Sequence, residues 1–396
     1  MNAGRSAAGE TWKEAISKMS DKLAVAFAPG LEGVVATRTR LSSVDGAAGR
    51  LLIAGFLVEE LAGRVSFEEM LYLLWNDALP DREQLAALRR DLAAQRALPK
   101  VTTEILAAAA VDRVPPMDAL RMASGMLGPK DGDDRDDALR LVAVLPTIVA
   151  SYRRLLQGRE PVEPDPELAH AANYLYMLSG EAPSPGQTQA LETYLNTVVD
   201  HGMNASTFAA RVIVSTRSDI VSAVVGAIGA LKGPLHGGAP GPALDLVFEI
   251  GEVGRADEYL RAKLNRGERL MGFGHRVYKV RDPRADVLGA AAEQLYSIDA
   301  DRALYELARE VEKTALSLLE EYKPGRNLQT NVEFYTALLL HGLSLPTEFF
   351  TPTFAVGRVG GWTAHCFEQQ ALDRLIRPQS EYIGSKNRSW VPLEER

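Results

Sequence analysis

A mainly helical protein with a small β-ribbon near its N-terminus is the fold class that this sequence predicts, on three observations. Most of the 396 residues lie in stretches whose apolar residues recur at helical spacing, as on the buried face of a helix. Only residues 30–56 show β-branched alternation, interrupted by the turn-forming pair Asp45-Gly46. The composition, 46% hydrophobic and 24% charged, is that of a globular chain with one large core or two domains.

Composition also narrows the class of partner. The formal net charge of -8 argues against binding to nucleic acid, although a local basic pocket for an anion remains compatible with it. The single cysteine, Cys366, excludes a disulfide framework and a cysteine-rich zinc site, and it fits a reduced, cytoplasmic setting. The longest apolar runs are shorter than the roughly 20 residues of a membrane span, so we expect a soluble protein. Residues 1–22 lack the apolar core of a signal peptide and are expected to form a polar arm.

Helix signals begin soon after the ribbon. Ser66 is followed three residues later by Glu69, which is the pattern of a capping box, and we expect Pro80 to end that helix. Residues 82–156 continue as helices, and Pro146 should bend the last of them.

Two segments are expected to be surface loops, the acidic residues 128–138 and the Pro/Glu residues 158–167. The helix predicted from Asp219 to Leu231 is built of Ala, Val, Gly and Ser, so it should pack closely against its neighbours or a second subunit. Further helical patterns follow beyond Asp282, separated by short Pro/Gly loops.

Standard motifs for nucleotide binding, serine hydrolysis and zincin chemistry are missing from the sequence. A metal site built from His201, His236 and His275 would lack carboxylate or cysteine ligands at metal spacing. We therefore predict neither a metal nor another cofactor.

Several histidines and arginines stand in unusual local contexts. Arginine forks bind carboxylates bidentately and imidazoles donate to a carbonyl, so the set suits a small dicarboxylate. A carboxylate beside them could remove a carbon-bound proton. The candidates are His201, His236, His275, Arg284, Glu333, Arg358 and Arg377.

The three histidines leave different alternatives open. His236 precedes a glycine pair and a helical run, and a helix N-terminus would keep its imidazole neutral as a hydrogen-bond donor. His201 is equally compatible with a core histidine whose neighbour Asp200 caps a helix. The basic residues that follow His275, including Lys279, suit either a solvated face or a phosphate site.

Six segments together resemble the signatures of the citrate synthase family in order and spacing. They are DHGMNASTFAARV, LKGPLHGGA, MGFGHRVYKVRDPRA, NVEFYTALLL, GRVGGWTAHCFEQ and RLIRPQSEYIG. The segment GLEGVVATRTRLSSVDG extends the resemblance from about Gly30 almost to the C-terminus.

The resemblance implies the two-domain helical fold of the shorter, dimeric form of that family. Residues 23–236 and 344–396 would form a large domain, and residues 237–343 a small domain that closes over the substrates. The implied partners are oxaloacetate, acetyl-CoA and a second copy of the chain, with neither nucleic acid nor membrane involved.

The resemblance also implies roles. His201, His275, Arg284 and Arg358 would bind oxaloacetate, with Arg377 reaching in from the partner subunit. His236 and Glu333 would flank the acetyl group, and His236, His275 and Glu333 would be catalytic. Lys279 stands where the family has a basic residue near the CoA phosphates. The implied reaction belongs to the tricarboxylic acid cycle, and acetyl-CoA is a substrate in it.

One position departs from the family's usual NVDFY motif, because Glu333 stands where Asp is usual. The extra methylene moves the carboxylate by about 1 Å, and misplacement of that size can cost roughly a hundredfold in rate. A catalytically weak paralogue that binds CoA and dicarboxylate is therefore one alternative. A second is a 2-methylcitrate synthase, since one methyl group is worth only about 1–3 kcal/mol in a pocket.

Overall fold

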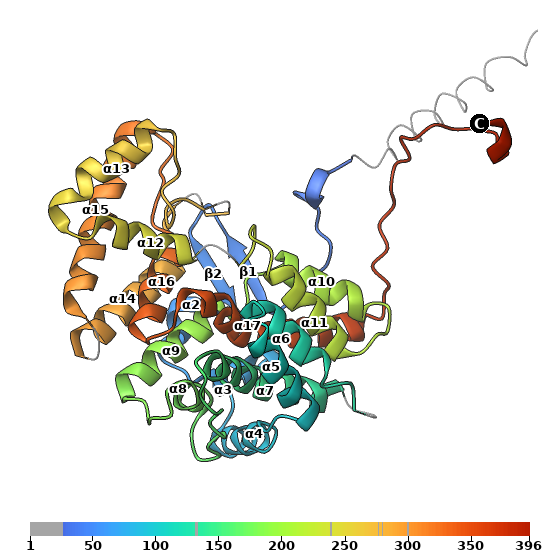
Figure 1. The fold of residues 1–396 in the computed structure, drawn as a ribbon, viewed down its shortest axis with the longest axis horizontal. Helices are drawn as coiled ribbons and strands as arrows, with labels where there is room; N and C mark the ends of the chain where they lie inside the picture. The colour runs from blue at the N-terminus through green and yellow to red at the C-terminus, as the bar shows by residue number, and fades with distance from the viewer. Residues whose placement is uncertain (1–26, 131–133, 238–239, 276, 279, 299–300) are drawn as a thin grey trace, which may run out of the picture. The chain divides into compact units, whose positions relative to one another are not determined.

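The computed structural model describes residues 27–130, 134–237, 240–275, 277–278, 280–298 and 301–396 (Figure 1). Contacts divide the chain into two units, Met1–Thr39 and Arg40–Arg396. In the first unit, the described residues include a short 3-10 helix, η1 (Pro29–Leu31). The polar arm predicted for residues 1–22 lies outside the described residues.

Helices make up most of the second unit, as the apolar periodicity predicts. The helices that precede the His201 segment are α2 (Val58–Leu61), α3 (Phe67–Asn76), α4 (Arg82–Ala94), α5 (Lys100–Val111), α6 (Pro116–Gly125), α7 (Asp134–Leu156), α8 (His170–Ser179) and α9 (Pro185–Val198). Those that follow are α10 (Ala205–Val214), α11 (Ile220–Leu231), α12 (Pro240–Ile250), α13 (Ala256–Asn265), α14 (Pro283–Ile298), α15 (Arg302–Tyr322), α16 (Val332–Gly342) and α17 (Phe350–Leu372). Short 3-10 helices are η2 (Val253–Arg255), η3 (Thr347–Phe349) and η4 (Leu393–Glu395).

The predicted ribbon is present as a three-stranded antiparallel sheet in the order β1-β2-β3. Its strands are β1 (Ser42–Asp45), β2 (Arg50–Ile53) and β3 (Phe56–Leu57). The Asp45-Gly46 turn is confirmed, because Asp45 pairs with Arg50 at the end of the β1–β2 ladder. A Cβ built on Gly46 would lie 2.2 Å from the carbonyl oxygen of Val277. The turn of the ribbon therefore rests against the segment that follows His275.

The capping box at the start of α3 is confirmed, since Ser66 and Glu69 bond reciprocally to each other's backbone N–H groups. The prediction that Pro80 ends this helix is wrong. Asp77 already adopts a left-handed conformation with φ of 60°. A residue in that conformation cannot continue the helical hydrogen-bond pattern, so α3 ends at Asn76.

The prediction of an acidic surface loop at residues 128–138 is also partly wrong, because α7 begins at Asp134. Acidic side chains are favourable in the first turn of a helix, where the backbone N–H groups point outward. Asp137 is buried there and pairs with Arg140 at 2.7 Å. The helix then runs through Pro146 to Leu156, and the predicted loop at residues 158–167 follows.

Helices α10 and α11 pack closely, as the small residues of α11 predict. A Cβ on Gly226 would lie 2.2 Å from the Cδ1 atom of Ile213 in α10. A larger residue at this position would require the Ile213 side chain to move. Within the described ranges, no helix combines the length and apolar character that crossing a membrane requires.

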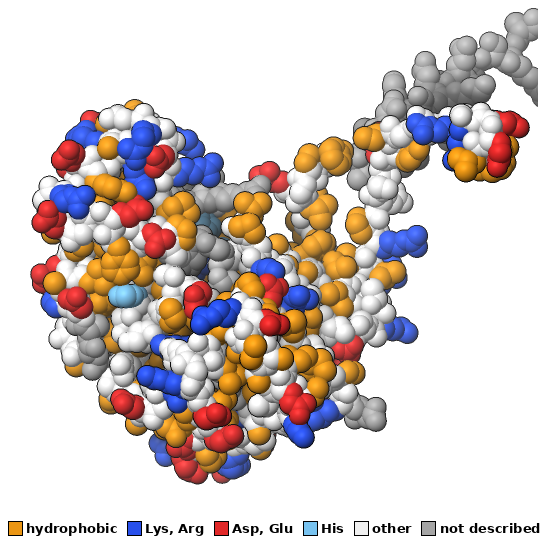
Figure 2. All heavy atoms as spheres, viewed as in Figure 1, with side chains coloured by type: hydrophobic (Ala, Val, Ile, Leu, Met, Phe, Trp, Pro, Cys, Tyr) orange, Lys and Arg blue, Asp and Glu red, His pale blue; other side chains and the backbone are white. Residues whose placement is uncertain are grey.

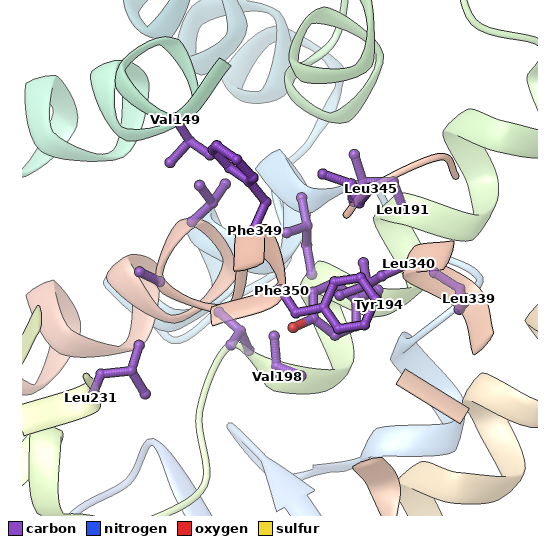
Figure 3. Close-up of a cluster of buried hydrophobic side chains, with 14 of the residues drawn as sticks. Val149, Leu191, Tyr194, Val198, Leu231, Leu339, Leu340, Leu345, Phe349 and Phe350 are labelled. Carbon is purple, nitrogen blue, oxygen red and sulfur yellow. The ribbon is translucent and has the colours of Figure 1, made fainter. Parts of the chain in front are cut away.

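The hydrophobic core reaches the backbone beside the candidate site. Figure 3 shows a cluster of buried side chains, among them Val149 of α7, Val198 of α9, Leu231 of α11, Leu340 of α16 and Phe350 of α17. Helix α17 approaches this backbone through its glycines, since a Cβ on Gly361 would lie 2.2 Å from the carbonyl oxygen of Val199. The segment that carries His201 therefore lies on a closely packed base.

Candidate active site

His201 and His275, which lie far apart in the sequence, meet edge to face, and the ring of Tyr278 contacts both. The centroids of the two imidazole rings are 6.1 Å apart. The Nε2 atom of His201 lies 3.1 Å from the hydroxyl oxygen of Tyr278, in hydrogen-bond distance. The fold thus brings together the segment between α9 and α10 and the loop before α14.

The loop geometry fixes the tautomer of His275. Its Nδ1 atom accepts hydrogen bonds from the backbone N–H groups of Val277 at 3.0 Å and Tyr278 at 3.1 Å. A nitrogen that accepts carries no proton, so the proton of the neutral ring is on Nε2. His275 therefore presents an N–H donor to its surroundings.

Arg284, at the start of α14, is buried and held by Asp282. Its Nε atom donates to Oδ1 of Asp282 at 3.0 Å and its Nη2 atom donates to Oδ2 at 2.8 Å. The guanidinium carbon lies 5.6 Å from the ring centroid of Tyr278. This bidentate pair fixes the direction of the guanidinium plane beside the two histidines.

Arg358 projects from α17 and is only 1% exposed. Its Nε atom donates to the carbonyl oxygen of Val198, and its guanidinium carbon lies 4.6 Å above the ring of Phe354. Burial lowers the pKa of Arg358 to about 10, an effect that the negative charge of Asp200 opposes. The group is still charged at neutral pH.

His236 lies between α11 and α12 and is hydrogen-bonded to the start of α10. Its Nε2 atom is 2.8 Å from the hydroxyl oxygen of Ser206, which also accepts from the indole N–H of Trp362 at 3.0 Å. The single hydroxyl proton of Ser206 can be donated to either of two acceptors, the ring of His236 or the Oδ1 atom of Asn204. The partner that receives it decides which ring nitrogen of His236 carries the proton.

Burial lowers the pKa of His236 to about 4, and the charge of Arg358 lowers it further in the same direction. The imidazole is therefore neutral at pH 7, as expected from the sequence. Desolvation is the largest cause of this shift. The contribution that we expected from the helix N-terminus stays a prediction.

Glu333 lies in the first turn of α16, which is joined to the loop of His275. Asn331 caps the helix by accepting from the backbone N–H of Glu333 at 3.0 Å, and its side-chain amide donates to the carbonyl oxygen of Gly274 at 2.9 Å. Burial raises the pKa of Glu333 to about 7, partly opposed by Arg284 and increased by Asp282. A carboxyl group that titrates there is well matched to proton transfer at neutral pH.

His201 shows that these groups share one environment. Burial lowers its pKa well below the ordinary value, and four further groups lower it in the same direction. They are Arg284, Arg358, His275 and His236. Five of the residues singled out in the sequence are therefore electrostatically coupled, and Glu333 joins them through Arg284.

Two predicted residues are not brought into this group. Arg377 is exposed in the C-terminal segment after α17, and no contact between described residues joins it to the histidines. Lys279 lies outside the described residues. The roles predicted for both stay predictions.

Tyr278 and Ser206 are site neighbours that the motifs did not single out. Tyr278 follows His275 by three residues, and Ser206 lies in the segment that begins Asp200-His201. Their closeness in sequence to the candidate histidines is the signal that could have identified them.

A cavity of about 90 Å³ adjoins this group, lined by His275, Tyr278, Asp282 and Thr330 among others. Among the described residues, no three His, Cys, Asp or Glu side chains gather in a way that could hold a metal ion. The fold and the site define a class: helical proteins in which neutral imidazoles and buried arginines are grouped beside a carboxyl group whose raised pKa suits proton transfer.

Comparison with known proteins gives the family. The model of the citrate synthase C-terminal domain matches residues 30–379. The chain is 42% identical over 375 residues to citrate synthase 2 of Bacillus subtilis, covering 93% of this chain and 98% of that protein. It is 40% identical over 368 residues to 2-methylcitrate synthase of Mycobacterium tuberculosis, covering 91% of each.

Solved structures agree with these matches. Citrate synthase from Pyrobaculum aerophilum superposes with a TM-score of 0.85 at 37% identity, covering 93% of this chain and 95% of that one. A ternary complex of carboxymethyl coenzyme A and oxaloacetate with the enzyme from Thermoplasma acidophilum gives a TM-score of 0.83 at 30% identity, covering 93% and 99%. The chain belongs to the citrate synthase family, acyltransferase-type enzymes that condense acetyl-CoA with oxaloacetate.

Proposed function

We propose that this protein condenses acetyl-CoA with oxaloacetate and hydrolyses the resulting citryl-CoA to citrate and CoA. One observation carries the proposal. The Asn331 side chain joins the helix of Glu333, a carboxyl with a pKa of about 7, to the loop of His275. A proton acceptor and a carbonyl-polarising donor are thus held on neighbouring backbone segments.

Oxaloacetate is expected to bind among His201, His275, Arg284 and Arg358. The two buried guanidinium groups attract its carboxylates, and the Nε2–H group of His275 donates to its ketone oxygen. A polarised ketone is a better electrophile, and the same donor stabilises the alkoxide that forms when the new carbon–carbon bond is made.

Glu333 is proposed as the general base that takes a methyl proton from acetyl-CoA. Neutral His236 donates a hydrogen bond to the enol oxygen that develops. This role needs the proton on Nδ1 of His236, which is the tautomer in which Ser206 donates its hydroxyl proton to Nε2. Asn204 then receives no proton from Ser206.

After condensation, water hydrolyses the thioester of citryl-CoA. The proposed chemistry uses acetyl-CoA as a substrate and requires neither a metal nor a redox cofactor.

We further propose that residues 237–343 form a small domain, and residues 23–236 and 344–396 a large one. Closure of the small domain over the large one would exclude bulk water. Lys279 would then lie near the CoA phosphates. The single, buried Cys366 supports the cytoplasmic location that we infer.

We propose a homodimer in which Arg377 reaches the site of the partner subunit. Hydrophobic side chains gather on the face over α6, α10 and α11 in Figure 2. Met126, directly after α6, is 38% exposed. Beyond α17 the chain runs away from the helical body in extended form (Figure 1), and its Ile383 and Trp390 are 92% and 78% exposed. Apolar surface of this kind is expected to be covered by a second copy.

The test is release of free CoA from acetyl-CoA and oxaloacetate, followed with a thiol reagent. The wild type should release one CoA for each citrate formed, and the E333Q variant should release none above background. A wild type that binds oxaloacetate and CoA without releasing thiol would instead be a binding paralogue.

A second candidate is 2-methylcitrate synthesis, favoured by the 40% identity to the mycobacterial 2-methylcitrate synthase. The extra methyl of propionyl-CoA is worth only about 1–3 kcal/mol in a pocket, so both substrates are expected to react. Comparing kcat/KM for acetyl-CoA and propionyl-CoA decides between the two, and a higher value for propionyl-CoA would favour the second.

A further inference from the structure

Asp200, the residue before His201, is fully buried and accepts hydrogen bonds from two distant elements. The hydroxyl of Ser42, in β1, donates to its Oδ2 atom. The Nε2 atom of His365, in α17, lies 3.1 Å from its Oδ1 atom. The β-ribbon and the glycine-rich helix thus meet at one carboxylate beside a candidate substrate residue.

The proton positions in this cluster follow from its neighbours. The Nη1 atom of Arg211 lies 3.0 Å from the Nδ1 atom of His365. A guanidinium group has donors and no acceptor, so Nδ1 of His365 must accept. The proton of the neutral ring is therefore on Nε2 and is donated to Asp200, which remains an anion.

Ser42 also holds the backbone on the other side of His201. Its hydroxyl oxygen accepts from the backbone N–H of Gly202 at 2.8 Å while its proton goes to Asp200. One hydroxyl group therefore bonds to the residue before and the residue after His201. Helix α17 packs against the same segment, because Gly361 closely approaches the backbone of Val199.

The charge of Asp200 also bears on Arg358. Burial by itself would raise the pKa of Asp200, but His365, Ser42 and Arg358 together hold it below the ordinary value. In return, Asp200 opposes the loss of charge that burial imposes on Arg358. Asp200 is thus the buried counter-charge of an arginine proposed to bind the dicarboxylate.

We propose that Ser42 and His365 are positioning residues that act through Asp200 to orient His201 and balance the charge of Arg358 in the oxaloacetate subsite. This inference rests on the proposed function. Because His201 and Arg358 are assigned to the dicarboxylate and not to the thioester, the loss of Ser42 should affect oxaloacetate far more than acetyl-CoA.

The experiment compares S42A with S42T and with S43A, an exposed neighbour on the same strand. The readouts are kcat, the KM of each substrate, the Kd of oxaloacetate by calorimetry and the Tm. S42A should raise the KM and Kd of oxaloacetate by about tenfold, as expected for the loss of hydrogen bonds to a charged group, and change the KM of acetyl-CoA less than about twofold. S42T keeps the hydroxyl and should restore wild-type values, and S43A should match the wild type.

A second pair of variants, at His365, tests the same cluster in case S42A has a folding defect. In H365Q the amide can accept from Arg211 and donate to Asp200, whereas H365L can do neither. H365Q should stay near wild type and H365L should show the same selective rise for oxaloacetate.

Three outcomes would overturn the inference. Unchanged oxaloacetate affinity in both S42A and H365L contradicts it while leaving the proposed function intact. If S42A and H365L raise the KM of both substrates equally, and in proportion to the decrease in Tm, the two residues have a structural role alone. A wild type that neither turns over nor binds oxaloacetate removes the proposed function, and this inference with it.

Discussion

The side-chain amide of Asn331 donates to the carbonyl oxygen of Gly274 at 2.9 Å, and so ties the start of α16 to the loop of His275. The link is reinforced in the backbone, where the N–H of Asn331 donates to the carbonyl oxygen of Gly272 at 3.0 Å. Gly272 and Gly274 have φ angles of 88° and 80°, a region in which glycine is favoured. The spacing between Glu333 and His275 is therefore set by backbone geometry.

Replacing Asn331 by Ala should lower kcat more than it raises either KM. The helix cap and the link to Gly274 are lost together, and a misplacement of about 1 Å between reacting groups can cost roughly a hundredfold in rate. Steady-state kinetics check this, with N265A at the exposed end of α13 as the control. A variant with wild-type kcat would show that this link does not position the base.

The pH dependence of kcat/KM for acetyl-CoA should show an acidic limb near pH 7. Glu333 must be ionised to accept a proton, and burial raises its pKa to about 7, so activity rises with pH through that value. Replacing Glu333 by Ala or Gln should reduce turnover by at least about a thousandfold, within the range expected for a general base. An E333A variant with wild-type turnover would remove Glu333 from the mechanism.

Replacing Glu192 by Gln should stabilise the protein at pH 8 and much less at pH 5. Burial raises the pKa of Glu192 to about 7 and the nearby Glu68 raises it further, so the folded state holds this proton more tightly than the unfolded state. Stability is then lost as the pH rises from about 4.5 to about 7, by roughly 1–3 kcal/mol at pH 8.

Denaturant unfolding of E192Q at both pH values checks this expectation, with E181Q on an exposed loop as the control. The gain should be present at pH 8 and small at pH 5, where the native Glu192 is already protonated. An equal gain at both pH values would mean that the carboxyl charge is not its cause.

Mixing two inactive variants should restore activity if Arg377 acts across the dimer. In the R377A homodimer and in the E333A homodimer, both active sites lack one required side chain. A mixed dimer keeps one intact site, so random pairing should recover about a quarter of the wild-type activity in a symmetric dimer. Co-expression and light scattering test this, and an active monomer or an absence of recovery would contradict the shared site.

The local sequence determined much of the fold. The Ser66 cap, the Asp45-Gly46 turn and the helical periodicity depend on residues a few positions apart, so they could be predicted without knowing the tertiary structure. The same local contexts singled out His201, His236, His275, Arg284, Glu333 and Arg358, which the structure places in one coupled group. The predicted end of α3 was wrong, because the helix stops where Asp77 adopts a left-handed conformation, and Pro80 does not indicate that conformation.

The tertiary structure alone decided the protonation of the site. His236 is neutral because it is buried, the tautomer of His275 follows from the backbone N–H groups that its loop presents, and the charge of Arg358 is balanced by Asp200. Desolvation and counter-charges depend on which side chains meet across the core, often more than a hundred residues apart in the chain. Local sequence patterns do not contain that information, so the sequence predicted the candidate residues and a neutral His236, but neither the tautomer of His275 nor the counter-charge of Arg358.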